Sequence, residues 1–355
     1  MKYTFEITVA GCAVNCAHCY VNGGPDKPIL LSDFEFVVNK MLPVLNRLEG
    51  NISLTLGNEI FCHPQIAEIL SFCNVTCKEY TSYKNFAVPT TGMALINRQD
   101  KDNILSALCD AETERFMLAV HGGRQRHNQI VQNAAAYDNL FQTVEFLRGR
   151  GFGILFNLMV SKALAEDFDE ILYKIGQYPE EKARLTVPLY VPTPRMKNYQ
   201  ALRADVNDCI QICHKAEQHG INTAVLWECL QNHCEKAVIE RVIQDGFDYP
   251  SCFAQSPEWA FFHITQGLDF YYGNVGAHTE YLGNFYRMNE EEIYRSIVEK
   301  PSNYNYTAMY PKAVWDTLEQ RIANLPERTL NLVYPSNEDC FYALLDGLGI
   351  QNSLI

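Results

Sequence analysis

The chain has 355 residues, of which 47% are hydrophobic, and a formal net charge of −13 at pH 7. This length allows one large hydrophobic core or two unequal ones, and the acidic balance disfavours a nucleic acid partner, whose phosphates would repel the protein. The sequence has no run of about 18 apolar residues and no signal-peptide pattern at its start, so we expect a cytoplasmic protein without a membrane partner.

A cysteine-rich loop follows the first expected strand, which spans Lys2 to Val9. Residues 11–20 read GCAVNCAHCY, so Cys12, Cys16 and Cys19 have the spacing C-x3-C-x2-C. Three thiolates from one loop can converge on one metal, whereas structural zinc sites and iron–sulfur clusters normally take four ligands. The incomplete set predicts a metal centre with one position open to a substrate or cofactor.

Other readings of these cysteines stay open at this point. The chain has thirteen cysteines, an odd number that favours reduced thiols and metal ligation over a disulfide framework. A zinc site with His18 or Cys62 as a distant fourth ligand is one alternative. Three ordinary buried thiols are the other.

The next segment predicts a helix, a strand and a tight turn. A helix is expected over Phe34 to Leu48, and residues 52–56 alternate as a strand that ends in Gly57-Asn58-Glu59. Asn58 can adopt the positive φ angle that such a turn requires. Glu59 then stands at the carboxyl end of the strand.

The alternation of strand and helix continues along the chain. Further strands are expected at residues 87–89, 115–120, 153–160, 184–191 and 221–226, and further helices at residues 64–72, 101–110, 134–150, 166–175 and 206–218. Six or seven strand–helix units predict a parallel sheet with right-handed crossovers. They are too few to close an eight-stranded barrel, and ligands of such sheets bind at the carboxyl ends of the strands.

Polar residues follow these expected strands, where ligands bind. They are Glu59, Thr91 in the turn Thr90-Thr91-Gly92, His121, Asn157, Ser161 and Arg195. Arg195 could clamp a carboxylate with two N–H groups, and His121 could hydrogen-bond to a substrate or carry a proton, so both are candidate catalytic residues. The alternatives are an exposed arginine and a strand-end histidine with an ordinary hydrogen bond.

The cysteine motif, followed by the aromatic Tyr20, resembles that of the radical S-adenosylmethionine (radical SAM) superfamily. The resemblance implies that Cys12, Cys16 and Cys19 hold a 4Fe-4S cluster whose fourth iron is chelated by the methionine part of S-adenosyl-L-methionine (SAM). It further implies that the cluster reduces SAM to a 5′-deoxyadenosyl radical, which removes a hydrogen atom from the substrate. Tyr20 would lie near the adenine.

Other turns extend the resemblance, with departures. Gly57-Asn58-Glu59 is similar to the G-G-E motif that holds the SAM amino group, with Asn58 in place of the second glycine. His127-Asn128 is similar to a His-Asp pair, but Val131 stands near the place of the usual arginine, so the partner of the SAM carboxylate is open. The expected cofactor-binding residues are Tyr20, Gly57, Asn58, Glu59, Thr91, Asn157 and Ser161.

The C-terminal third resembles a SPASM or twitch extension. Cys252, the hairpin residues 267–272 and the L-G-N sequence at 282–284 occur in the order typical of that extension, but no cysteine stands near Tyr272. We therefore expect a SPASM-like scaffold without a complete auxiliary cluster. A cluster rebuilt from Cys229, Cys234 and Cys252 is the alternative. The tyrosines of the hairpin are expected to form a lid over the substrate.

The expected fold class is α/β, a partial (β/α)6 radical SAM barrel over residues 1–226 with a SPASM-like α+β extension over residues 227–355. The expected function is radical SAM modification of a ribosomally made peptide. A small-molecule substrate, such as a sugar or amino acid derivative, and a non-catalytic metal- or cluster-binding protein are the alternatives. An electron donor such as flavodoxin or ferredoxin is an expected partner of the enzyme.

Overall fold

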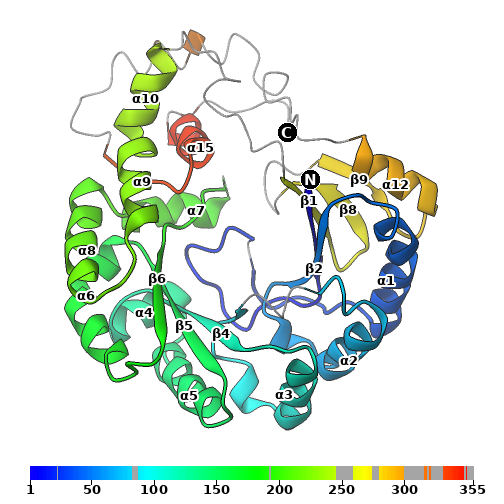
Figure 1. The fold of residues 1–355 in the computed structure, drawn as a ribbon. Helices are drawn as coiled ribbons and strands as arrows, with labels where there is room; N and C mark the ends of the chain where they lie inside the picture. The colour runs from blue at the N-terminus through cyan, green and yellow to red at the C-terminus, as the bar shows by residue number, and fades with distance from the viewer. Residues whose placement is uncertain are drawn as a thin grey trace.

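The structure is a computed structural model. It describes residues 1–21, 23–81, 87–191, 193–244, 259–273, 280–299 and 331–347, together with residues 316, 317, 320 and 349. Strands line the inside of an open ring and most helices cover its outside (Figure 1). Within the described ranges, no helix has the length and apolar character needed to cross a bilayer.

Six parallel strands form the first part of the ring. They are β1 (Lys2–Thr8), β2 (Asn51–Gly57), β3 (Val88–Thr90), β4 (Arg115–Val120), β5 (Gly153–Met159) and β6 (Lys182–Thr186). β1 pairs with β2, and β3, β4, β5 and β6 pair in chain order in a separate sheet. All these pairs are parallel, so the carboxyl ends of the strands share one edge of each sheet.

Helices follow these strands, and most of them lie on the outside of the ring (Figure 1). They are α1 (Leu31–Leu45), α2 (Ile66–Thr76), α3 (Lys101–Asp110), α4 (Arg124–Val131), α5 (Ala136–Arg148), α6 (Lys162–Ile175), α7 (Pro194–Tyr199), α8 (Val206–Gln218), α9 (Ala224–Asn232) and α10 (Glu235–Gln244). The amphipathic pattern of α6 is clear in its buried positions, which recur every three or four residues from Ala163 to Ile175. α3 and α8 have the predicted bounds.

A strand from the last third of the chain continues the first sheet. β7 (Trp259–Ile264) pairs in parallel with β1, and β8 (Asp269–Tyr272) and β9 (Glu280–Asn284) follow it antiparallel, giving the order β2-β1-β7-β8-β9. Phe5 of β1 stacks on Phe262 of β7 at a ring-centroid distance of 5.0 Å. The helix α12 (Glu290–Val298) lies beside α1.

The proposed division at residues 226 and 227 stays a prediction. That boundary falls within α9, and β7, from the second part, hydrogen-bonds along β1, from the first. Cys252, which the alternative auxiliary cluster requires, lies outside the described residues.

The prediction of a strand at residues 221–226 is wrong. Ile221 follows Gly220, whose φ is +70°, and Asn222 accepts a hydrogen bond on its side-chain oxygen from the backbone N–H of Ala224, where α9 begins. This side-chain turn starts a helix instead of a strand. β6 also ends earlier than expected, before Pro188, which has no N–H to continue the ladder.

Two short helices were not expected. α7 begins at Pro194 after Thr193, whose hydroxyl accepts the backbone N–H of Met196 at 3.2 Å. A capping threonine before a proline is a typical helix start, although this segment was interpreted as a turn. α4 was missed as well, because its mostly polar sequence gives little hydrophobic periodicity.

The prediction that the tyrosine-rich hairpin forms a lid over the substrate is also wrong. Phe270 and Tyr272 of β8 are buried and pack against Phe262 of β7. Tyr271 points to the opposite face, because successive side chains of a strand alternate, and its ring faces that of Tyr281 at 5.4 Å. None of the three lines the cavity described below.

The C-terminal helix α15 (Asn337–Gly347) lies near α7 (Figure 1), and Lys197 of α7 forms an ion pair with Asp346 of α15. The segment before α15 is joined to the ring through Arg203. Arg203 is 1% exposed, and its guanidinium donates to the carbonyls of Pro188, Leu189 and Val333 at 2.9, 3.1 and 3.3 Å. It also lies over the ring of Tyr334 at 4.4 Å. One buried cation therefore links the segment that follows β6 to the C-terminal segment that precedes α15.

We predict that Arg203→Met lowers the free energy of unfolding by about 3 kcal/mol, because three buried carbonyls lose their donor. Urea unfolding followed by circular dichroism measures the loss. The exposed Arg150→Met is the control and should cost less than about 1 kcal/mol, as a solvent-exposed ion pair does. Equal losses for the two variants would contradict the role of Arg203 as a buried link.

Candidate active site

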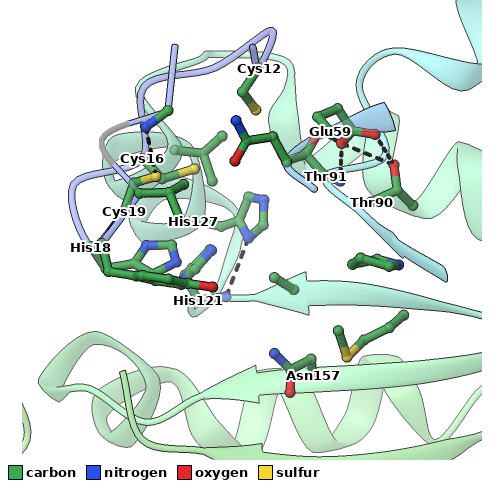
Figure 2. Close-up of a pocket in the computed structure, with 18 residues that line it drawn as sticks. Cys12, Cys16, His18, Cys19, Glu59, Thr90, Thr91, His121, His127 and Asn157 are labelled. Carbon is green, nitrogen blue, oxygen red and sulfur yellow. Dashed lines mark hydrogen bonds between the residues drawn. The ribbon is translucent and has the colours of Figure 1, made fainter. Parts of the chain in front are cut away.

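A cavity of about 250 Å³ opens at the carboxyl ends of the strands (Figure 2). Its lining comes from the loop after β1, the ends of β2 to β5 and α4. The lining residues are Cys12, Cys16, His18, Cys19, Tyr20, Val21, Gly23, Asn58, Glu59, Pro89, Thr90, Thr91, Met117, Ala119, His121, His127, Val131 and Asn157. The cavity thus collects most of the residues expected to bind a metal or cofactor.

The cysteine loop is held by backbone hydrogen bonds at both ends and in the middle. The N–H of Cys12 donates to the carbonyl of Gly24 at 2.7 Å, and that of Ala17 donates to the carbonyl of Ile130 at 2.8 Å. A Cβ on Gly11 would lie 2.3 Å from the Gly24 oxygen, so only glycine fits there. The loop therefore folds back on itself and against α4.

Two of the three thiols lie together. Figure 2 shows the sulfurs of Cys16 and Cys19 side by side, with Cys12 farther away along the loop. A Cβ on Gly23 would lie 3.3 Å from the Cys19 sulfur and 3.6 Å from the Cys12 Cβ, so the three cysteines surround one small space. No group of three or more His, Cys, Asp or Glu side chains within the described ranges is already placed as a metal site.

The chemistry of the donor set fits a cationic metal centre. Burial raises the pKa of Cys16 to about 12 and that of Cys12 still higher, so both are protonated thiols in this apolar setting. The backbone N–H of Gly23 donates to the Cys19 sulfur at 3.1 Å. A metal cation would supply the charge that stabilises three thiolates here, with release of their protons.

Glu59 is the one carboxylate in the lining, and it is 4% exposed. It follows Asn58, whose φ is +64° as the turn requires and whose side-chain N–H donates to the carbonyl of Ala10 at 3.1 Å. Thr91 donates to Oε2 of Glu59 through its backbone N–H at 2.6 Å and its hydroxyl at 2.7 Å. The Thr90 hydroxyl lies 3.0 Å from Oε1. Burial raises the pKa of Glu59, and these hydrogen bonds oppose that rise because they stabilise the carboxylate. The carboxylate form could bind a cation in the cavity.

Gly57 and Tyr20 lie close to a second buried carboxyl, that of Glu6 on β1. A Cβ on Gly57 would lie 2.8 Å from Oε1 of Glu6, so glycine is required at this position. Gly57 does not itself line the cavity, whereas Tyr20 does. Burial raises the pKa of Glu6 to about 7, and Glu6 helps to raise the pKa of the Tyr20 hydroxyl.

Three histidines gather on one side of the cavity. The rings of His18 and His121 lie 4.3 Å apart between centroids, and those of His121 and His127 lie 5.3 Å apart. His121 was predicted as a catalytic residue, whereas His18 was considered only as a zinc ligand. The position of His18 between Cys16 and Cys19 was the sequence feature that could have predicted a place in the cavity.

Asn157 lines the cavity from β5, and its orientation is fixed by β6. Its side-chain oxygen accepts from Nε of Arg184 at 2.8 Å and from the Thr186 hydroxyl at 2.5 Å. The amide nitrogen is therefore the atom left for other contacts, here with the Met159 sulfur at 3.2 Å. Sequence reasoning missed Arg184 and Thr186, because only the register of β5 and β6 brings them beside Asn157.

Two other predicted residues lie outside the cavity lining. Ser161 caps α6, with its hydroxyl accepting the backbone N–H of Leu164 at 3.1 Å. Arg195 donates to the carbonyl of Gly23 at 2.5 Å and thus braces the cysteine loop from α7. Their cofactor and substrate roles stay predictions. Val131, at the place of the missing arginine, lines the cavity and packs with Val14.

Comparison with solved structures shows the same fold. Native anSMEcpe with bound AdoMet matches with a TM-score of 0.53 and 13% identity, covering 99% of this chain and 100% of that one. The anSMEcpe structure with AdoMet and the Kp18Cys peptide has a TM-score of 0.55 and 12% identity, covering 98% and 96%. SuiB of Streptococcus suis bound to S-adenosylmethionine has a TM-score of 0.50 and 12% identity, covering 82% and 65%. No protein-family model and no curated protein matches the sequence. The expected fold class, a partial α/β barrel with a C-terminal extension, is confirmed.

The buried Glu6 makes stability depend on pH. Its folded-state pKa of about 7 lies above its ordinary value of 4.5, so the folded chain keeps a proton that the unfolded chain releases between these values. Stability from this group therefore falls as the pH rises through that window. We predict that Glu6→Gln is more stable relative to the parent at pH 8 than at pH 4, measured by urea unfolding.

A second carboxyl, that of Glu235, also has its pKa raised to about 7 and titrates in the same window. Glu235 is present in the parent and in Glu6→Gln, so its contribution cancels when their free energies of unfolding are compared. If the free energies of unfolding of Glu6→Gln and the parent differed by the same amount at pH 4 and pH 8, Glu6 would have its ordinary pKa in the folded chain.

Proposed function

We propose that this chain is a radical SAM enzyme that modifies a peptide. The observation that carries the proposal is one cavity lined both by the three cysteines of the C-x3-C-x2-C loop and by Glu59. The cavity opens where ligands bind in sheets of this kind. The fold shared with AdoMet-bound structures supports the same assignment.

In this proposal the chain's own residues bind and orient the reactants. Cys12, Cys16 and Cys19 hold a 4Fe-4S cluster, which when bound supplies the single electron for homolytic cleavage of SAM. Glu59 would accept a hydrogen bond from the ammonium of the SAM methionine, beside the hydrogen bonds that it accepts from Thr90 and Thr91. Tyr20 would pack beside the adenine.

The apolar part of the lining has a separate role. Val21, Pro89, Met117, Ala119 and Val131 contribute no polar side chain to the cavity. An apolar wall excludes water and holds a substrate C–H bond in a fixed orientation, which is what hydrogen-atom abstraction demands of the protein. The adjoining histidines supply the polar contacts of the wall.

The anSMEcpe structure with the Kp18Cys peptide and AdoMet supports a peptide substrate. Its similarity to this chain covers 98% of this chain and 96% of that one. An electron donor such as flavodoxin or ferredoxin would reduce the cluster. The cytoplasmic location is proposed with the enzyme, since reduced thiols and a low-potential cluster suit a reducing compartment.

Replacement of Cys12, Cys16 or Cys19 by Ala should abolish cluster retention and SAM cleavage, because two thiolates do not hold the cluster. The parent, reconstituted anaerobically with iron and sulfide, should hold about four irons per chain. Iron analysis and chromatography of 5′-deoxyadenosine measure the two effects. The exposed Cys109→Ala is the matched control and should behave as the parent.

Parent-level 5′-deoxyadenosine from Cys16→Ala would refute the assignment of the cluster loop. About eight irons per chain in the parent, half of them kept when Cys12, Cys16 and Cys19 are all replaced, would instead reveal an auxiliary cluster in the extension.

The role of Glu59 is tested separately from iron. Glu59→Gln removes the negative charge but keeps an oxygen for Thr90 and Thr91, so iron content should not change. Loss of a charge-assisted hydrogen bond of about 2 kcal/mol should weaken SAM binding roughly 30-fold in equilibrium dialysis. The exposed Glu68→Gln is the control. Unchanged SAM affinity in Glu59→Gln would exclude Glu59 as the partner of the ammonium.

A further inference from the structure

Three cationic side chains lie on the inner face of the sheet that contains β4, β5 and β6. Alternate residues of these strands are buried on the side that the helices cover, among them Phe116 and Leu185. Successive side chains of a strand point to opposite faces, so the intervening residues face the inside of the ring (Figure 1). They include Arg115, Lys182 and Arg184. This face contrasts with the net charge of −13 of the whole chain.

Arg184 lies next to the cavity without being part of its lining. It is the Cα partner of Asn157, and its Nε donates to Asn157 Oδ1 at 2.8 Å while Nη2 donates to the Met117 sulfur at 2.9 Å. Both acceptors belong to residues that line the cavity. Figure 2 shows Asn157 on the side of the cavity away from Cys12. The guanidinium therefore lies at the inner end of the cavity, and Lys182 is the next residue of β6 on the same face.

The Arg184 guanidinium has no anionic partner. Among the described residues neither Arg184 nor Lys182 forms an ion pair, whereas Arg115 lies 3.7 Å from the carboxylate of Glu114. Nη1 of Arg184 donates to no described group, although a guanidinium has five N–H donors. Burial lowers the pKa of Arg184, and no neighbouring carboxylate opposes this shift. The side chain is nevertheless exposed, so a ligand can reach it.

Glu6 does not supply the missing negative charge. It alternates with the buried Phe5 and Ile7 on β1 and so faces the inside of the ring from the other sheet. Burial raises the pKa of Glu6 to about 7, whereas a guanidinium close to it would lower that pKa. Glu6 and Arg184 are therefore not a pair, and the cationic face is open to an anion that enters the ring.

We propose that Arg184 and Lys182 form a substrate subsite for a carboxylate group, which binds inside the ring beside the cavity. A guanidinium offers parallel N–H groups that match the two oxygens of a carboxylate, and Lys182 adds a point charge. The inference rests on the proposed function and specifies its substrate. The peptide would carry a carboxylate, from an acidic side chain or from its C-terminus, close to the residue that reacts.

Four short peptides test the charge preference and the source of the carboxylate. They are acetyl-Ala-Glu-Ala-amide, acetyl-Ala-Gln-Ala-amide, acetyl-Ala-Lys-Ala-amide and acetyl-Ala-Gln-Ala with a free C-terminus. Binding to the full-length chain, reconstituted with iron and sulfide and saturated with SAM, is measured by saturation-transfer NMR at pH 7. At least one carboxylate peptide should bind roughly tenfold more tightly than the glutamine amide, and the lysine peptide should not. The preferred carboxylate peptide identifies the source.

Variants of the two cations test their roles. Arg184→Gln should remove most of the preference for a carboxylate, because it removes the charge and the paired N–H groups. Arg184→Lys keeps the charge alone and should retain part of the preference, and Lys182→Gln should lower it less than Arg184→Gln does. Arg150→Gln, which replaces an exposed arginine paired with Asp102, is the matched control and should leave the preference unchanged.

Thr186→Val separates recognition of charge from support of Asn157. The Thr186 hydroxyl donates to the same Asn157 oxygen as Arg184, at 2.5 Å, so its removal disturbs that side chain without changing the charge of the face. The preference for a carboxylate should persist in Thr186→Val. If Thr186→Val and Arg184→Gln weakened all four peptides alike, Arg184 would only position Asn157 and the subsite would be overturned.

Three further results would overturn the subsite. They are equal binding of all four peptides, an unchanged preference in Arg184→Gln, and a preference that is lost when SAM is added, which would assign Arg184 to the SAM carboxylate. If Arg184→Gln did not fold, salt would decide on the parent chain. Raising NaCl from about 0.05 M to about 0.5 M should weaken the preference for a carboxylate, because salt screens exposed charges, and a preference independent of salt would contradict the subsite.

The proposed function is measured apart, by iron content and 5′-deoxyadenosine in the same samples. The preference for a carboxylate can therefore fail while SAM cleavage persists. A chain that binds the carboxylate peptides but cleaves no SAM is an equally distinct result.

Discussion

The buried carboxylate of Glu59 joins the two halves of the ring. β2 and β3 belong to different sheets, and among the described residues no ladder joins these two strands. Glu59 stands at the end of β2, and the donors that hold it, Thr90 and Thr91, stand at the end of β3. The carboxylate that lines the cavity is therefore also a contact between the sheets, and both of its oxygens take part in that contact.

The cysteine loop depends on contacts with several parts of the fold. Ala17 is bonded to α4, and the Gly23 carbonyl accepts from Arg195 at the start of α7. α7 is in turn joined to the C-terminal segment, because Lys197 of α7 forms an ion pair with Asp346. The last third of the chain thus contributes to the candidate site in two ways. β7 extends the sheet that carries β1, and the C-terminal segment supports the helix that braces the loop.

Local sequence signals predicted the parts of the site that depend on local geometry. The cysteine spacing, the glycine at position 57 and the positive φ of Asn58 follow from a strand that ends in a tight turn. The strand order β2-β1-β7 and the support of Asn157 by Arg184 could not be predicted in this way. Both depend on which strands become neighbours, and periodicity within one strand carries no information about that.

Burial determines the charge states of the whole cavity. It raises the pKa of Cys16 to about 12, lowers that of His127 to about 4, and opposes ionisation of Glu59. In the free chain the least costly cavity is one with protonated thiols and neutral imidazoles. A cationic metal centre reverses this preference for the thiols alone, because each thiolate then has a direct ligand bond.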